Sequence, residues 1–331
     1  MAIQWKRRLA AGLVLAVLPL IMTAGSLHFH CEEARAAQVI KEEKGTYGCL
    51  TWPQNLNAVR SEVEIFKKIP KDLRADTPIA NAIYRNTQVY TNSLMLDMRQ
   101  LPAEKPLFYR VRAYDLDGHP IGPYSQPADV ESALFKTERN APIPHDSYGK
   151  GNGSVLLYPV YAYTGNPNAA RYEVEVTSKY PENLHGFSPS VHRIYAAKTE
   201  LTDLYDDAPR TGTYYWRVRG MDSTGKPVGE WSLPQEIKNP VKHWKVAVYG
   251  DSISHGGGHL SFGPADLAYS YESYLDFPSI NLSQSGDTSE AMVMRFEKDV
   301  LPFSPEYLLI LGGTNSLRAG VPAADVISDM K

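Results

Sequence analysis

An internal repeat is the feature that most restricts how this chain can fold. Two segments align without a gap at an offset of 107 residues, FYRVRAYDLDGHPIGPYSQP (Phe108 to Pro127) and YWRVRGMDSTGKPVGEWSLP (Tyr215 to Pro234). Each copy alternates in polarity, turns at DLDG or DSTG, and returns toward an aromatic residue and a serine. Alternation on both sides of such a turn predicts a β-hairpin in each copy.

Further short strands are expected before each hairpin. SEVEIF begins at Ser61 and RYEVEVTS at Arg171, while LTWPQN near Leu50 and VLLYPVYA near Val155 open the two repeats. Several short strands in about 100 residues, separated by proline, glycine and asparagine, are typical of a β-sandwich. In the first repeat the stretch KDLRADTPIANAIYRNTQ breaks the pattern, which predicts a long loop or an extra helix.

The repeats resemble the fibronectin type III domain, most clearly in the hairpin that ends in an aromatic residue and a serine. We place two such all-β domains at 45–135 and 150–238. The resemblance implies modules that act as spacers or as surfaces for glycans or proteins. The hairpin aromatics could form a carbohydrate platform, but aromatics on sandwich strands usually pack in the core, and we favour packing. These aromatics are Tyr109, Tyr124, Trp216 and Trp231.

The sequence changes character after the linker KNPVKHW. The runs KVAVYG, SINLSQSG and YLLILGG are apolar or β-branched and each closes on glycine. Between the last two, TSEAMVMRFEKDVLPF predicts a helix. Strands alternating with helices predict a parallel sheet flanked by helices, with function at the carboxyl ends of the strands. The helix is expected to bury one face made of Ala291, Val293, Met294, Phe296, Val300 and Leu301.

Polar motifs follow the three apolar runs. They contain Gly250-Asp251-Ser252, Ser285-Gly286-Asp287 and Gly312-Gly313-Thr314-Asn315. Because parallel strands end at one edge of a sheet, a hydroxyl, a backbone amide and a side-chain amide are expected to meet there. Acyl transfer requires an oxygen nucleophile and N–H donors where negative charge develops. Glycine allows a backbone N–H to approach closely, because it has no Cβ.

In their order and spacing these motifs resemble the SGNH, or GDSL, hydrolase family, with GDSIS, NLSQSGDTS and GGTNS similar to its first three blocks. The resemblance implies a flavodoxin-like α/β/α fold for 244–331 and esterase, lipase or thioesterase activity without a metal or organic cofactor. It implies Ser252 as nucleophile, and the Ser252 and Gly286 amides with the Asn315 side chain as oxyanion donors. We expect Asp251, which supports the turn, to be structural, as are Asp287 and Thr288, because such residues often cap helices.

The fourth block of the family, a late Asp-x-x-His that supplies the general base, does not follow Asn315. Domains of this type usually need well over 100 residues, and this region has about 90. We therefore expect an incomplete hydrolase domain that is inactive alone, with the catalytic histidine in a part of the protein after Lys331. A true stop codon there would instead favour a fragment or an inactive product.

His255 and His259 follow the nucleophile within SHGGGH. His255 could act as the base, line a substrate pocket, or belong to a turn. The glycines favour a loop, so we favour the pocket or turn role. A zinc site at these two histidines lacks a third ligand, and the glycine run lacks the Lys-Ser/Thr of a phosphate loop.

The N-terminal segment predicts export. Basic residues at 6–8 precede an apolar stretch at 9–24, and Ala34-Arg35-Ala36 suits a signal peptidase, which predicts a signal peptide at 1–36. A retained anchor is the alternative, but about 16 apolar residues fall short of the ~20 that span a bilayer. We expect a secreted or cell-envelope protein without a membrane span. Cys31 would leave with the signal, so Cys49 would be unpaired and inert.

A formal net charge of -3 provides no basic surface for nucleic acid. We therefore expect an exported serine ester hydrolase whose substrate is an ester, such as an acylated glycan. Its oligomeric state is open. The alternative is a non-catalytic surface or extracellular adhesion protein with a degenerate hydrolase domain.

Overall fold

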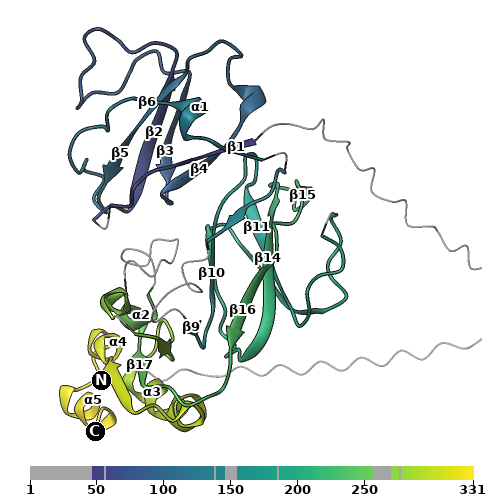
Figure 1. The fold of residues 1–331 in the computed structure, drawn as a ribbon. Coiled ribbons are helices and arrows are strands. Elements are labelled where there is room, and N and C mark those ends of the chain that lie inside the picture. The colour runs from purple at the N-terminus through teal and green to yellow at the C-terminus, as the bar shows by residue number, and fades with distance from the viewer. Residues whose placement is uncertain are drawn as a thin grey trace, which may run out of the picture. The chain divides into compact units, whose positions relative to one another are not determined.

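The computed structural model describes residues 47–331 except 56, 138, 146–154, 185, 257–269 and 276. The expected signal peptide at 1–36, Cys31 and His259 lie outside the described residues. Two parts of the chain consist mainly of strands, and the C-terminal part alternates strands with helices (Figure 1). Within the described ranges, no helix is long and apolar enough to cross a membrane.

The first part, residues 47–137, is a β-sandwich that we call sandwich 1. One sheet has the strand order β4-β1-β7 and the other has the order β3-β2-β5-β6. The strands are β1 Tyr47–Thr51, β2 Arg60–Phe66, β3 Tyr84–Val89, β4 Ser93–Asp97, β5 Phe108–Tyr114, β6 Ala128–Asp129 and β7 Phe135–Thr137; η1 Met98–Gln100 and α1 Val130–Ala133 are short helices. The irregular stretch of the first repeat forms a loop as far as Ile83 and then enters β3, so the helix alternative is wrong.

The second part, residues 143–144 and 160–239, is sandwich 2. Its sheets have the orders β13-β10-β8 and β12-β11-β14-β15, and β16 also pairs with β14. The strands are β8 Ile143–Pro144, β10 Val160–Thr164, β11 Arg171–Thr177, β12 Arg193–Thr199, β13 Asp203–Tyr205, β14 Gly212–Met221, β15 Pro227–Val228 and β16 Gln235–Asn239. Tyr161, Tyr163, Val174, Trp216 and Val218 lie in its core.

The repeated hairpin contains a buried ion pair in both sandwiches. In sandwich 1 Arg110 donates to Glu64 at 2.8 Å, and its guanidinium lies 3.9 Å from the ring centre of Tyr124. In sandwich 2 Arg217 donates to Glu175 at 2.9 Å, beneath the ring of Trp231. Burying a charge is costly unless it is paired, which explains why both members of the pair occur in each copy.

The aromatics of the repeat are buried. This confirms the prediction that they pack in the core and do not form a carbohydrate platform. Tyr124, Trp216 and Trp231 are at most 4 % exposed, and Tyr109 is 8 % exposed. The repeated serine has a structural role as well. Ser125 Oγ accepts the Val111 N–H at 3.0 Å, and Ser232 Oγ accepts the Val218 N–H at the same distance.

The third part contains a parallel sheet with the order β19-β17-β18-β9. Its strands are β9 Val155–Leu156, β17 Val246–Gly250, β18 Ser279–Asn281 and β19 Tyr307–Leu311. Its helices are α2 Ser252–His255, η4 Tyr271–Tyr274, α3 Ser289–Asp299, η5 Leu301–Phe303, α4 Thr314–Arg318 and α5 Ala323–Asp329. β9 lies between β8 and β10 of sandwich 2 in the chain but pairs with β18, so the run VLLYPVYA divides between this sheet and strand β10 of the sandwich.

The predicted helix forms as α3, and its predicted buried face is right only in part, because Val300 is buried and Phe296 packs against the core. Val293, Met294 and Leu301 are exposed, as are apolar side chains of the neighbouring strand β19. The buried face instead carries Ser289, Met292, Arg295 and Asp299. Apolar periodicity misplaced the three exposed side chains because it takes no account of Arg295, which is buried through ion pairs with Asp287 and Asp299.

Candidate active site

The polar motifs begin at one edge of the parallel sheet. β17 is buried along its whole length and pairs in parallel with β18 and β19. Backbone hydrogen bonds continue past the strands: the Gln284 N–H donates to Gly250 O at 3.1 Å, and the Asp251 N–H donates to Leu311 O at 3.4 Å. The loops after all three strands are therefore held together where they leave the sheet.

Ser252 is the first residue of α2 and follows directly on this edge. Asp251 precedes it as the N-cap, and its side chain accepts the Ile253 N–H at 3.0 Å. Gly250 approaches Leu311 so closely that a Cβ would lie 2.0 Å from the Leu311 carbonyl oxygen, so only glycine fits. Ser252 is half-buried, and among the described residues its hydroxyl and its backbone N–H have no hydrogen-bond partner.

Gly286 and Asn315 lie on the two neighbouring loops. Gly286 has a φ of 92°, which favours glycine, and its exposed N–H is unpaired within the part of the chain that the structure describes. The Asn315 side chain donates to the carbonyl oxygen of Asp287 at 2.8 Å. This bond uses one of the two side-chain N–H groups of Asn315, so the other remains for a ligand.

A second contact also joins these loops. Thr288 caps α3 by accepting the Ala291 N–H, and the next residue, Ser289, donates its N–H to Ser316 Oγ at 2.9 Å. Two hydrogen bonds therefore hold Asn315 against the loop that carries Gly286. One is made by the Asn315 side chain, and the other by the hydroxyl of the next residue, Ser316.

Arg295 is a positioning residue that the sequence interpretation missed. From α3 its guanidinium donates to the carbonyl oxygens of Leu282 at 2.6 Å and Gly250 at 3.2 Å, and it pairs with Asp287. Burial raises the pKa of Asp287, and Arg295 opposes that rise. The acid four residues later, Asp299, was the available signal, because it can pair with Arg295 along one helix face.

His255 is buried and both of its ring nitrogens are engaged. Nδ1 accepts the Ser285 N–H at 3.0 Å, and Nε2 lies 2.7 Å from the Tyr158 carbonyl oxygen, to which it donates. Burial lowers the pKa of His255 to about 4, so the ring is neutral at pH 7. This arrangement leaves neither nitrogen free to take a proton from Ser252 or to bind zinc.

A second buried network supports α2. Asn281 donates to the Ser254 carbonyl oxygen at 2.6 Å and also to Glu272, which accepts from Ser279 as well. Burial raises the pKa of Glu272 to about 8. A lone glutamate gave no signal of this role in the sequence.

Three side chains with metal-ligating atoms gather at one exposed turn of sandwich 1, Asp115, Asp117 and His119. Turn geometry explains part of this grouping, because Asp115 accepts the His119 N–H at 2.7 Å, as Asp222 accepts the Lys226 N–H at 2.9 Å in sandwich 2. Within the described ranges no other such group occurs, so none involves Ser252.

Comparison with protein families agrees with the motifs in this part. Residues 248–331 match the GDSL-like Lipase/Acylhydrolase family. The match covers the three strand-end loops described above and supports a hydrolase domain at the C-terminal end of the chain. A comparison with curated proteins gave no match.

Solved structures gave weak likenesses. The FN1-FN3 domains of chicken CNTN1 are 15% identical with a TM-score of 0.18, covering 59% of this chain and 56% of that one. The glycoside hydrolase domain of Endo-D from Streptococcus pneumoniae R6 is 13% identical with a TM-score of 0.19, and the match covers 58% of this chain and 28% of that one. Purple acid phosphatase PPD1 from yellow lupin (Lupinus luteus) is 12% identical with a TM-score of 0.20, and the match covers 82% of this chain and 55% of that one. This chain thus spans about half or less of each, and at such TM-scores none supports an argument.

Proposed function

We propose that this protein is an exported serine ester hydrolase with Ser252 as its nucleophile. The observation that carries the proposal is a serine hydroxyl that has no partner among the described residues and lies at the edge of the sheet where two further loops present N–H donors. The family match of residues 248–331 supports the same class of reaction. An acyl ester of a carbohydrate is the substrate class that we favour for an exported enzyme preceded by two sandwiches.

The reaction proceeds in two steps. Ser252 Oγ attacks the acyl carbon while a general base takes its proton, and the oxyanion receives hydrogen bonds from the Ser252 and Gly286 amides and the Asn315 side chain. The protonated base then gives its proton to the leaving alcohol. Water, activated by the same base, cleaves the acyl-enzyme and releases the acid. We assign this base to a histidine outside the described residues, because His255 has no free ring nitrogen.

Architectural details belong to the same proposal. We assign both sandwiches to the fibronectin type III type, because the repeated hairpin and the two-sheet arrangement occur in each copy. We assign the C-terminal part to the flavodoxin-like type, because its strands are parallel and α3 connects β18 to β19.

The test is acylation of Ser252 by p-nitrophenyl acetate with imidazole added as an external base. Peptide mass spectrometry is expected to find the acetyl group on Ser252, and Ser252→Ala is expected to lose it. Asn315→Ala is expected to fold normally and to slow acylation by about 10² to 10³, the typical effect of losing one oxyanion donor. Ser304→Ala, before β19 at the opposite end of the sheet, serves as control and is expected to leave the rate unchanged.

Acetylation that falls on other residues, or that is equally fast in Ser252→Ala, would reject Ser252 as nucleophile. An unchanged rate in Asn315→Ala would remove that side chain from the oxyanion site. A protein that is never acylated under these conditions would favour the alternative, a binding protein with a degenerate hydrolase domain.

A further inference from the structure

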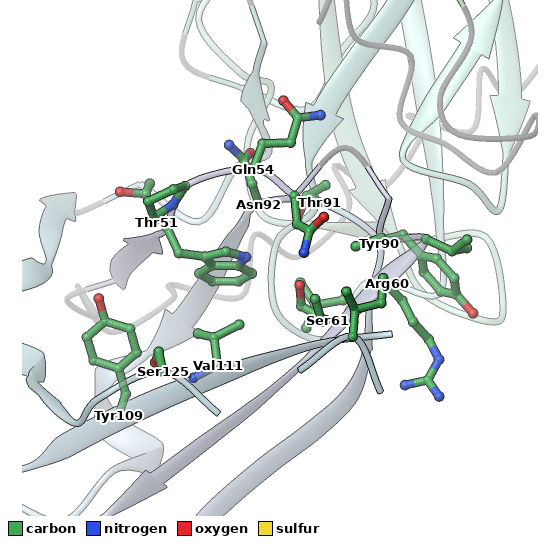
Figure 2. Close-up of a pocket in the computed structure, with 18 of the residues that line it drawn as sticks. Thr51, Gln54, Arg60, Ser61, Tyr90, Thr91, Asn92, Tyr109, Val111 and Ser125 are labelled. Atoms are coloured by element: carbon green, nitrogen blue, oxygen red, sulfur yellow. Dashed lines mark hydrogen bonds between the residues drawn. The ribbon is translucent and has the colours of Figure 1, made fainter. Parts of the chain in front are cut away.

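Sandwich 1 contains a pocket between the ends of its two sheets. Its volume is about 430 Å³, within the range of about 300–1,000 Å³ typical of small-molecule sites. Figure 2 shows Thr51, Gln54, Thr91 and Asn92 along one side of this pocket, and Tyr109, Val111, Ser125 and Ser61 along the other. The first group ends or follows β1 or precedes β4, and the second belongs to or borders the sheet that contains β2 and β5.

The first of two differences between the sandwiches that open this space lies on the paired strands of the hairpin sheet. Ser61 pairs with Ala113 in sandwich 1, and Tyr172 pairs with Gly220 in sandwich 2. Since Gly220 is the residue that aligns with Ala113 in the repeat, Ser61 occupies the place of Tyr172. Tyr172 is 8 % exposed and packs edge-on against Tyr163, with ring centres 5.0 Å apart. The ring that fills sandwich 2 is therefore replaced by a hydroxymethyl group in sandwich 1.

A second difference lies directly beside the first. The residue after β10 is Gly165, and a Cβ there would lie 2.1 Å from the Tyr172 hydroxyl. The residue after β1 is Trp52, which lines the pocket and packs against the core of sandwich 1. A bulky residue at this place is compatible with serine at position 61 but not with tyrosine. The exchange of tyrosine and glycine for serine and tryptophan produces a hollow with an aromatic wall.

The chemistry of the lining suits an uncharged, hydroxyl-rich ligand. No aspartate, glutamate or lysine lines the pocket among the described residues, and the Arg60 guanidinium already donates to Thr87 O at 2.6 Å and lies over the Tyr114 ring. His145 also lines the pocket, and its Nε2 is engaged with Thr164 Oγ1 at 2.9 Å. The half-buried amides of Gln54 and Asn92 have no side-chain hydrogen bond to any described residue. Amide and hydroxyl side chains both donate and accept, as sugar hydroxyls do. An alkyl chain would leave these amides desolvated without partners.

We propose that this pocket binds a neutral sugar unit of a glycan. The Trp52 indole lies against an apolar face of the ring, and Gln54 and Asn92 bind its hydroxyls. Apart from His145, which follows β8 of sandwich 2, the described lining belongs to sandwich 1, and the inference does not depend on Ser252 as nucleophile. It would give the protein a means of holding a polysaccharide at a site separate from the one at which esters are cleaved.

The test is an NMR titration of the whole protein carrying Ser252→Ala, so that ester cleavage plays no part. The probes are the methyl glycosides of glucose, galactose, mannose, xylose and N-acetylglucosamine, with methyl galacturonate glycoside as a charged probe and octanoate as an acyl-chain probe. We expect at least one neutral glycoside to bind. Ser61→Tyr, which installs the residue of sandwich 2, and Trp52→Ala are each expected to weaken that binding by at least about tenfold.

Tyr180→Ala is the matched control, because Tyr180 is an exposed aromatic of sandwich 2. The affinity of this variant for the neutral glycoside is expected to be unchanged. If Ser61→Tyr or Trp52→Ala does not fold, Asn92→Ala is the variant that decides, since its side chain is half-buried and makes no bond to the described residues. Binding of octanoate in place of the glycosides, binding of none of the probes, or glycoside binding that survives the pocket variants would overturn the proposal.

Discussion

The two sandwiches share a framework but differ in how their interiors are filled. Both place a buried glutamate beneath an arginine and an aromatic ring, and both use a serine hydroxyl to cap the same strand amide. Sandwich 2 fills the end of its core with Tyr172, whereas sandwich 1 has Ser61 and an open pocket there. The comparison teaches that the hairpin and its ion pair maintain the fold, which leaves the end of the core free to change.

The glutamates of the shared framework provide the strongest test of that comparison. Glu64→Gln and Glu175→Gln keep the side-chain shape but leave Arg110 or Arg217 buried without its main counter-charge. Each is expected to lower the free energy of unfolding of its own sandwich by about 3–5 kcal/mol. Denaturant unfolding followed by hydrogen exchange measures each sandwich separately. A large effect in one sandwich and none in the other would break the equivalence of the two frameworks.

Tyr172→Ser, which gives sandwich 2 the residue of sandwich 1, is expected to have a somewhat smaller effect. The change removes a buried ring and its contact with Tyr163, so a loss of about 3 kcal/mol is expected, at the low end for deleting a large aromatic side chain. Thermal unfolding of the variant measures it. A loss below about 1 kcal/mol would mean that the tyrosine adds little to the core and that its absence does not explain the pocket.

Cys49 gives the smallest expected effect. It is the third residue of β1, where β10 has Ala162, and it is buried. Burial raises the pKa of its thiol to about 11, so Cys49 in the folded protein should not react with iodoacetamide near neutral pH, as peptide mapping of the alkylated protein would show. Cys49→Ala is expected to cost about 1 kcal/mol, because it removes one small apolar group. Rapid alkylation of the native protein would show that this strand opens readily and that the thiol is not inert.

Much of this architecture could be predicted from local patterns. The gapless repeat and the alternating strands predict tandem sandwiches, and apolar runs closing on glycine predict a parallel sheet. The strand-end motifs placed Ser252, Gly286 and Asn315 on adjacent loops without any long-range information. These predictions succeed where a residue's surroundings follow from its nearest neighbours along the chain.

The remainder depends on contacts between distant residues. Arg295 is buried on one face of α3 and donates to carbonyls that lie 13 and 45 residues away in the chain, so apolar periodicity identified that face only in part. The state of His255 is set by the carbonyl of Tyr158, 97 residues earlier. The pocket depends on which residue faces Ala113 across the sheet, which the sequence shows only after the strands have been paired.

The pairing of β9 with β18 has a consequence for how the protein folds during synthesis and for where it can be shortened. Val155 and Leu156 join the C-terminal sheet, and Tyr158 donates its hydroxyl to Asp299 at 2.5 Å, although strands β10 to β16 of sandwich 2 lie between β9 and β17 in the chain. The chain thus begins the C-terminal sheet, completes sandwich 2 and only then returns to that sheet. A shortened protein starting at Trp244 would lose an edge strand and the partner of His255, and a ribosome must complete all of sandwich 2 before this sheet can close.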